Sequence, residues 1–233
     1  SMKYRNLTIN EIDILKQQFC IAENWDNVLV RENFKPDYIT NVKFSGCVKL
    51  GVFEKEFVLP AGLKKHSGIN KATLHNCEIG NDVSIENVQN YIANYKIGDN
   101  VFIQNIHLMY VEGRTTFGNG VEVSVLNETG GREVLINDQL SAHLAYMQSF
   151  YRHRPVLIGR LRDMVRTYAE ENASDIGYIG NNVKILNCGA IKNVWIGDCT
   201  EIEGTRHLEN GSINSNEHDP VHIGYSVIAN DFI

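Results

Sequence analysis

The chain has 233 residues, which is enough for one large domain or two small ones. Its hydrophobic fraction of 43% and charged fraction of 21% are ordinary for a soluble globular protein. The net charge of −6, with no cluster of Lys and Arg, argues against a nucleic-acid partner, and no apolar run approaches the roughly 20 residues of a membrane span.

The N-terminal segment, residues 1–37, is predicted to be a short helix followed by an irregular connector. Thr8 and Glu11 have the spacing of a capping box, which starts a helix over residues 8–20. The apolar side chains that share one face of this helix are Ile12, Leu15 and Phe19. No basic start followed by an apolar core marks a secretory signal here. We expect a helical cap that covers unpaired strands at one end of the fold.

Residues 38–134 carry a repeat that is clearest between Glu78 and Gly113. Written as two lines of 18 residues, EIGNDVSIENVQNYIANY and KIGDNVFIQNIHLMYVEG, this stretch aligns Ile79 with Ile97. A six-residue beat runs inside each line, which fits no helical period but fits short parallel strands, three per turn, joined by tight corners. Gly and Asn supply the corners, because both accept left-handed backbone angles cheaply. The repeat predicts an all-β protein whose strands stack into a parallel β-helix.

Residues 135–173 interrupt the beat and are predicted to be an inserted α-helical hairpin. One helix spans 137–153, and Pro155 stands where a second helix begins. The beat returns in residues 174–233, which end in the middle of a turn of the repeat. Since a solenoid normally ends in a capping unit, we expect a longer natural protein or a partner that covers this end.

The five cysteines form no CxxC motif and are odd in number. Cys77, Cys188 and Cys199 lie on the repeat where small inward residues are expected, so we interpret them as core filler in a reducing cytoplasm. A zinc site or a disulfide is the alternative. The sequence thus predicts a cytoplasmic protein with no metal site and no bound cofactor.

The repeat residues IGNDVSI, IGDNVFI, IGNNVKI and IGDCTEI resemble the hexapeptide repeat of left-handed β-helix proteins, and the left hand is implied by this resemblance alone. The wider chain, through LGVFEKEF, NYIANYKIGD and SAHLAYMQSFYRHRP, resembles a bacterial family of unknown function labelled as related to UDP-N-acetylglucosamine pyrophosphorylase/acetyltransferase. The resemblance implies transfer of an acyl group from acyl-CoA or an acyl carrier to a sugar, nucleotide-sugar or amine. It also implies a homotrimer with a histidine base between neighbouring subunits. The alternative is a non-catalytic β-helix scaffold or a nucleotide-sugar-binding protein.

Candidate catalytic residues are histidines that face outward, since a neutral imidazole takes a proton from a hydroxyl or amine near pH 7. Counting back from Ile79 puts Thr73 and Cys77 inward and leaves His75 on the corner between them. His207 is predicted to point outward from a flat face. His75 and His207 are therefore the predicted catalytic residues. The alternative for each is a surface histidine with no catalytic role.

The polar loop NETGGR, residues 127–132, is the predicted substrate-binding segment. Glu128 can act as an acid or base, or orient a histidine. Arg132 can hold a phosphate or carboxylate in bidentate fashion, and the two glycines let the backbone approach a ligand closely. We predict that Asn127, Glu128 and Arg132 bind the substrate. The alternative is a strand-to-helix connector in which Asn and Thr supply turn bonds.

Overall fold

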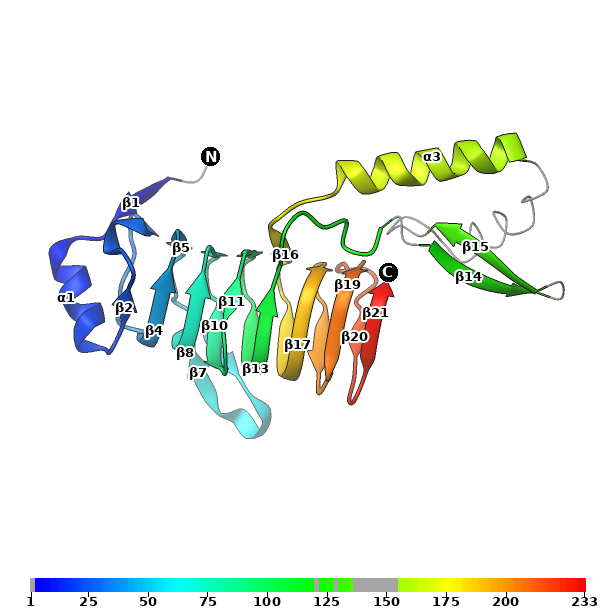
Figure 1. Ribbon diagram of the computed structural model, residues 1–233. Helices are drawn as coiled ribbons and strands as arrows, with labels where there is room; N and C mark the ends of the chain where they lie inside the picture. The colour runs from blue at the N-terminus through cyan, green and yellow to red at the C-terminus, as the bar shows by residue number, and fades with distance from the viewer. Residues whose placement is uncertain (1–2, 120–121, 128–129, 136–154) are drawn as a thin grey trace.

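In the computed structural model, which describes residues 3–119, 122–127, 130–135 and 155–233, the protein is predominantly β with few helices, as predicted (Figure 1). Most described strands belong to one large mixed sheet, and the others form small antiparallel pairs. The described helical segments are α1 (Ile9–Gln17), α3 (Pro155–Glu171) and the short 3-10 segments η1 (Trp25–Asn27) and η2 (Pro60–Gly62).

The parallel pairings of the large sheet fall into three ladders in the described part of the chain, and the chain passes through them in turn. The first ladder contains β3 (Val28–Arg31), β5 (Val48–Leu50), β9 (Glu78–Ile79), β12 (Tyr95–Ile97), β16 (Gly177–Ile179) and the ends of β17 (Lys184–Ile196) and β19 (His207–Ile213). The second contains the starts of β4 (Ile39–Ser45), β8 (Gly68–His75), β13 (Phe102–Tyr110) and β17, with β10 (Ser84–Val88), β18 (Glu201–Glu203) and β20 (His222–Ile223). The third contains β2 (Ile21–Ala22), the ends of β4, β8 and β13, β11 (Ile92–Ala93), the middle of β17, β19 (His207–Ile213) and β21 (Ile228–Phe232). The sheet is mixed because β1 (Tyr4–Asn6) pairs antiparallel with β3.

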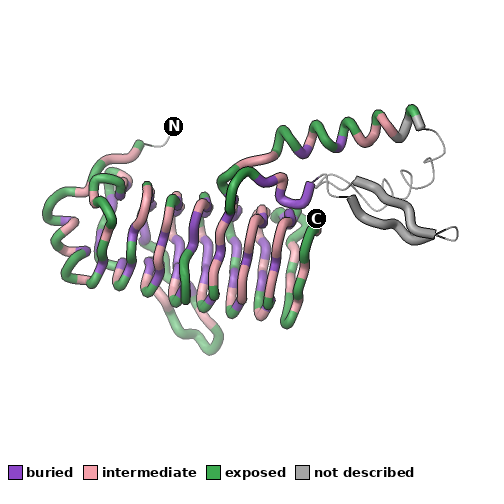
Figure 2. Tube along the Cα trace, in the orientation of Figure 1, coloured by how far each residue is buried: buried purple, intermediate pink, exposed green. Residues whose placement is uncertain are grey.

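The register of the ladders is the one that the 18-residue repeat predicts. Ile79 pairs with Ile97, and Ile85 pairs with Ile103. These side chains are 0–1% exposed, and buried residues recur in every turn of the stack (Figure 2). Burial of each isoleucine contributes roughly 1.5–3 kcal/mol. The six-residue beat is thus the spacing of inward side chains in successive ladders.

Corner asparagines stack on one another between ladders. Asn87, Asn105 and Asn187 have φ of +57°, +57° and +53°, the left-handed region that Asn tolerates well. The Asn87 amide donates to Asn105 Oδ1 at 3.1 Å, and the Asn105 amide donates to Asn187 Oδ1 at 2.8 Å. Glycines allow close stacking at other corners: a Cβ on Gly80 would lie 2.4 Å from the carbonyl oxygen of Gly98. The prediction that Gly and Asn form the corners is confirmed.

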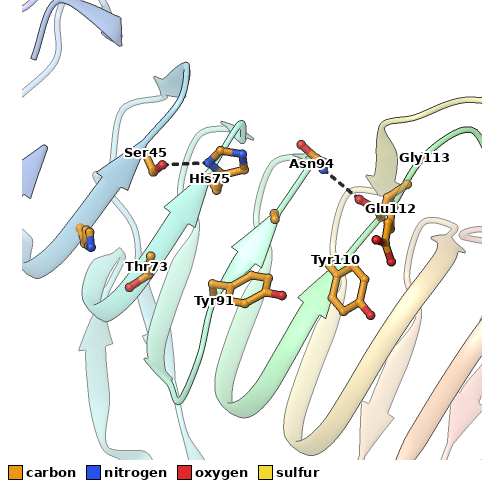
Figure 3. A pocket seen from close by; sticks show the side chains of 11 residues that line it. Ser45, Thr73, His75, Tyr91, Asn94, Tyr110, Glu112 and Gly113 are labelled. Carbon is orange, nitrogen blue, oxygen red and sulfur yellow. Dashed lines mark hydrogen bonds between the residues drawn. The ribbon is translucent and has the colours of Figure 1, made fainter. Parts of the chain in front are cut away.

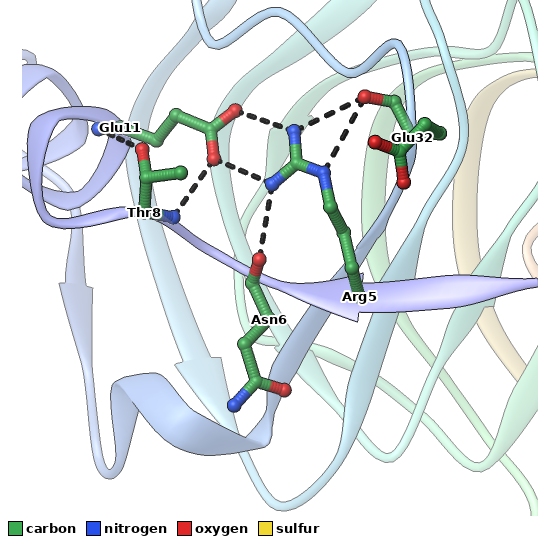
Figure 4. A network of polar contacts seen from close by, with 5 residues as sticks. All are labelled: Arg5, Asn6, Thr8, Glu11 and Glu32. Carbon is green, nitrogen blue, oxygen red and sulfur yellow. Dashed lines mark hydrogen bonds and ion pairs between the residues drawn. The ribbon is translucent and has the colours of Figure 1, made fainter.

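The N-terminal helix α1 begins at the predicted capping box. Thr8 Oγ1 accepts from the Glu11 N–H at 3.1 Å, and Glu11 Oε1 accepts from the Thr8 N–H at 2.9 Å (Figure 4). Arg5 in β1 donates to both Glu11 carboxylate oxygens, at 2.7 and 3.0 Å. This guanidinium, followed by the backbone bond from Thr8, outweighs burial and holds the pKa of Glu11 below its usual value. An ion pair between Arg5 and Glu11 therefore links β1 to α1.

One apolar residue assigned to α1 lies elsewhere. Leu15 is fully buried in the core, as expected. Phe19 is 76% exposed, with φ +63°, because α1 ends at Gln17 and the chain turns there. The prediction that Phe19 shares the buried face is wrong.

Two hairpins leave the ladders. β6 (Glu56–Val58) pairs antiparallel with β7 (Lys64–His66), where the chain projects from the stack (Figure 1). β14 (Glu122–Asn127) pairs antiparallel with β15 (Gly130–Leu135) in a sheet of its own. The prediction places residues 122–134 in the stack, but the reversal near the Gly130-Gly131 pair closes a local hairpin instead.

The helical part of the insertion is described from Pro155 onward. α3 begins at Pro155, as predicted, and runs to Glu171. The helix predicted over 137–153 lies outside the described residues. β13 nevertheless pairs directly with β17, Ile103 opposite Ile185, so the chain re-enters the ladders in register.

The cysteine predictions are confirmed for two of the three repeat positions. Cys77 and Cys188 are 2% and 6% exposed, and burial raises the pKa of the Cys77 thiol to about 12. Cys199 is only half-buried and sits at a corner with φ +59°, so its assignment to the core is wrong. All five cysteines are free.

Candidate functional site

A groove of about 620 Å³ lies on the outer face of the third ladder (Figure 3). Strand alternation builds it: Leu74 points into the core, which leaves Thr73 and His75 on the outer face of β8. Along the ladder, His75 is followed by Ala93 and then Tyr110. Because Ala93 is small, the surface is hollow between the imidazole and the phenol ring.

Two tyrosine side chains form one wall of the groove. The ring centroids of Tyr91 and Tyr110 are 6.0 Å apart, and Tyr91 is 40% exposed. Lys192, one step further along the ladder, places its Nζ 5.6 Å from the centroid of the Tyr110 ring. We call Tyr91 and Tyr110 the tyrosine shelf.

The predicted residue His75 lies at the other side of the groove, half-buried and held at both ring nitrogens. Its Nδ1 lies 2.9 Å from Ser45 Oγ, and its Nε2 lies 3.1 Å from the Asn76 side-chain nitrogen. Ser45 Oγ donates to a Glu23 carboxylate oxygen at 2.9 Å. Asn94, on the next turn, has its Oδ1 3.3 Å from the Asn76 nitrogen. Thus His75 faces outward, as predicted.

The register around His75 differs in detail from the prediction. The corner lies at Asn76, with φ +49°, and His75 is the last residue of β8. Thr73 lines the groove and does not point inward, because Leu74 takes the inward position. Cys77 does point inward, as predicted.

The second predicted histidine, His207, lies on the same ladder but far from the first. Four strand steps separate them, from β8 through β11, β13 and β17 to β19. At the usual strand spacing this is roughly 19 Å, so the two histidines do not act on one atom. His207 Nε2 lies 3.2 Å from Glu209 Oε2. His207 contacts Glu209 and does not line the groove.

The predicted substrate-binding loop does not join the groove in the described part of the chain. Asn127 lies opposite Gly130, and Arg132 lies opposite Val125, in the separate β14–β15 hairpin. Glu128 lies outside the described residues. That Asn127, Glu128 and Arg132 bind the substrate therefore stays a prediction.

Sequence reasoning missed the groove residues Ser45 and Asn94, the tyrosine shelf, and Glu23, which contacts Ser45 from outside the groove. The repeat held a signal for the shelf: Tyr91 and Tyr110 fall at neighbouring positions of the two 18-residue lines. Nothing comparable marks Glu23, because it precedes the clear repeat. Among the described residues, no group of three or more His, Cys, Asp or Glu side chains is placed to hold a metal ion. No helix in the described ranges is long and apolar enough to cross a membrane.

The fold and groove define a predominantly β protein of stacked strands with an outward histidine beside aromatic rings. The model of a family described as a domain of unknown function (DUF4954) matches residues 4–233, and the chain belongs to this family. It is similar to an uncharacterized protein of Treponema pallidum (strain Nichols), with 27% identity over 235 residues that cover 96% of this chain and 32% of the relative. The chain thus spans about a third of the length of the curated relative it matches.

These comparisons correct the resemblance drawn from the repeat. The family model that matches is described as a domain of unknown function and not as a hexapeptide-repeat or acetyltransferase family, so that assignment is wrong. The physical reason is that inward isoleucines and Gly-Asn corners are required wherever strands of this length stack in register. The motif therefore specifies strand stacking and not common descent.

Proposed function

We propose that the groove binds a sugar, or the sugar part of a nucleotide-sugar, with one face of the sugar ring on the tyrosine shelf. The observation that carries this proposal is the pair of adjacent phenol rings in an open groove rimmed by amide, hydroxyl and imidazole groups. A sugar ring has an apolar C–H face and a polar hydroxyl edge. Tyrosine rings match the face, and their hydroxyls match the edge.

Charged side chains at the ends of the groove support binding of a polar ligand. Lys43 lines the end near Ser45, and Glu112 lines the opposite end. Neither side chain forms an ion pair with another described residue, so both are available to a ligand. Asn94 is held in place by a bond from its Nδ2 to the Val111 carbonyl oxygen at 2.8 Å. A ligand therefore meets fixed amide groups in the middle and adaptable charges at the ends.

Acyl transfer from acyl-CoA or an acyl carrier to a hydroxyl of the bound sugar is the second candidate. The observation that favours it is His75, an oriented imidazole on the rim of the same groove. An imidazole in this place can take the proton of an attacking hydroxyl. We also propose that the three ladders close into a left-handed parallel β-helix and that three copies associate in the cytoplasm. Passage of the chain through three parallel ladders in turn supports the first of these, and the open side of the groove leaves room for a neighbouring copy.

The experiment is a thermal-shift and calorimetric titration with N-acetylglucosamine, UDP-N-acetylglucosamine, UDP, coenzyme A and acetyl-CoA. A ligand at 100 times its Kd adds about 2.7 kcal/mol of stability. We expect a sugar compound to raise Tm, and Tyr110→Ala to weaken its binding by about tenfold. Tyr225→Ala, which removes a tyrosine that is 72% exposed outside the groove, is the matched control.

The panel separates the candidates. A shift with the coenzyme A compounds supports acyl transfer, whereas a shift with uridine compounds alone supports nucleotide-sugar binding without catalysis. If no sugar compound binds, or if Tyr110→Ala and Tyr225→Ala bind equally well, the sugar proposal is overturned.

A further inference from the structure

The hydrogen bonds around His75 determine which ring nitrogen carries the proton, starting from the Asn76 side. The backbone N–H of Cys47 donates to Asn76 Oδ1 at 3.0 Å. A backbone N–H can only donate, so the amide oxygen must face Cys47 and the amide nitrogen must face His75. The Asn76 N–H therefore donates to Nε2 of His75, which must present a lone pair there. The proton of the neutral ring is then on Nδ1.

The opposite end of the network gives the same answer independently. An ionised carboxylate only accepts hydrogen bonds, so the single proton of the Ser45 hydroxyl points to Glu23. Ser45 Oγ can then only accept from His75 Nδ1. Figure 3 shows Ser45 on one side of the imidazole and Asn94 on the other. The Cys47 N–H, which can only donate, and the Glu23 carboxylate, which only accepts, thus imply the same tautomer of His75.

We propose that Glu23 is a positioning residue that acts through Ser45 to hold His75 as the Nδ1–H tautomer, with Nε2 presented as the proton acceptor. Glu23, Ser45 and His75 come from segments separated in sequence by 22 and 30 residues, and the third ladder brings them side by side. No carboxylate of a described residue contacts the His75 ring directly. The serine is therefore the link between the imidazole and the negative charge.

This assignment deepens the proposed function and rests on it for its catalytic meaning. Asn76 also reaches Asn94 Oδ1, so its amide keeps an acceptor when a ligand hydroxyl replaces it at Nε2. The proton of that hydroxyl moves to Nε2, while Nδ1 keeps its own proton. The ring becomes a cation, and the Glu23 carboxylate offsets this charge through Ser45. The hydroxyl oxygen then attacks the carbonyl carbon of an acyl thioester, so that a C–O bond forms and the C–S bond breaks. The leaving thiolate takes the proton from Nε2, which restores the neutral ring.

The test reads the tautomer directly, without any ligand. Ring-nitrogen chemical shifts of ¹⁵N-histidine-labelled protein are recorded at a pH where the imidazoles are neutral, and His75 is assigned with His75→Asn. In the unmodified chain we expect the Nδ1–H form of His75 to exceed the other tautomer by about tenfold or more, as two directed hydrogen bonds imply. Ser45→Ala removes the link, and Glu23→Gln allows an amide N–H to reverse the serine hydroxyl. Both variants should lower the excess of the Nδ1–H form several-fold, because the hydrogen bond from Asn76 to Nε2 then acts alone.

The controls exploit the second histidine of the same ladder. Glu209→Gln should change the signals of His207, which Glu209 contacts, and leave those of His75 unchanged. Ser45→Thr keeps a hydroxyl and should keep the Nδ1–H form. The proposal is overturned if unmodified His75 is mainly Nε2–H, or if Ser45→Ala and Glu23→Gln leave the ratio of its two tautomers unchanged. Since no sugar is present, failure of sugar binding and failure of this network are seen in separate experiments.

Discussion

Replacing Tyr95 with phenylalanine measures how much one buried hydroxyl stabilises the stack. Tyr95 is fully buried, and its hydroxyl donates to the Val194 carbonyl oxygen at 2.7 Å and accepts from the Val194 N–H at 3.3 Å. Burial strongly raises the pKa of Tyr95, so the hydroxyl stays neutral. Phenylalanine leaves two buried backbone groups unpaired, at roughly 1–3 kcal/mol each. The variant has no hydroxyl to remove from water on folding, and this saving offsets part of the loss. We therefore expect the free energy of unfolding to fall by about 2–4 kcal/mol.

The assay is urea unfolding followed by tryptophan fluorescence, since Trp195 adjoins Val194. With a slope of about 2–3 kcal/mol per M, the unfolding midpoint should fall by about 1 M urea. Tyr178→Phe is the matched control, because Tyr178 is half-buried and no hydrogen bond of its hydroxyl to a described residue is seen. If both variants unfold within about 0.5 kcal/mol of the original chain, the reasoning about the Val194 groups is refuted.

Three further perturbations test the packing and charge of the fold. Glu11→Gln should cost about 1 kcal/mol at pH 7. The pKa of Glu11 in the folded protein lies below its usual 4.5, so the carboxylate stabilises the fold above pH 4.5, and this stabilisation is lost as the pH falls through the lowered pKa. Thermal unfolding should therefore show a smaller difference in Tm between the original chain and Glu11→Gln at pH 3 than at pH 7. Gly80→Ala should lower Tm by several degrees, because its methyl group meets the Gly98 carbonyl oxygen; an unchanged Tm would contradict the close stacking. Alkylation of the native protein at pH 8, followed by mass spectrometry, should modify the exposed Cys47 first, with rapid labelling of buried thiols counting against the packing. The buried thiols expected to react only after unfolding are Cys20, Cys77 and Cys188.

The stacked strands could be predicted because the inward positions of the ladders are buried and accept mainly aliphatic side chains. An aliphatic residue must recur in each ladder, so the positions of Ile79, Ile97 and Ile103 in the sequence predict which residues of neighbouring strands pair. Outward side chains follow from alternation, which is why His75 was found. Thr73 was misplaced because inward residues are two apart within a strand but three apart across a corner, as Leu74 and Cys77 are around Asn76.

The partners of His75 could not be predicted from local pattern. Ser45 and Glu23 precede the clear repeat, and their distances from His75 depend on which strands become ladder neighbours. The sequence around Asn76 carries no sign of this role, since Asn is common at such corners. Its hydrogen bond from the Cys47 N–H, which orients the amide, forms only when β8 lies beside the preceding turn of the stack.

The direct pairing of β13 with β17 has a consequence for how the chain folds during synthesis. Asn105 and Asn187 are 82 residues apart, compared with 18 for Asn87 and Asn105, yet both pairs stack in the same way. For a flexible chain, closing the longer loop costs only about 1.3 kcal/mol more, which is less than the gain from burying one isoleucine.

The time between the synthesis of β13 and that of β17 affects folding more than this free-energy cost does. Residues 111–183 separate the two strands, and a ribosome that adds about 5–20 residues per second needs roughly 4–15 s to make them. During this interval the N-terminal half of the stack exists with β13 as an unpaired parallel edge. An emerging chain must keep that edge from pairing with other nascent chains until its own β17 arrives.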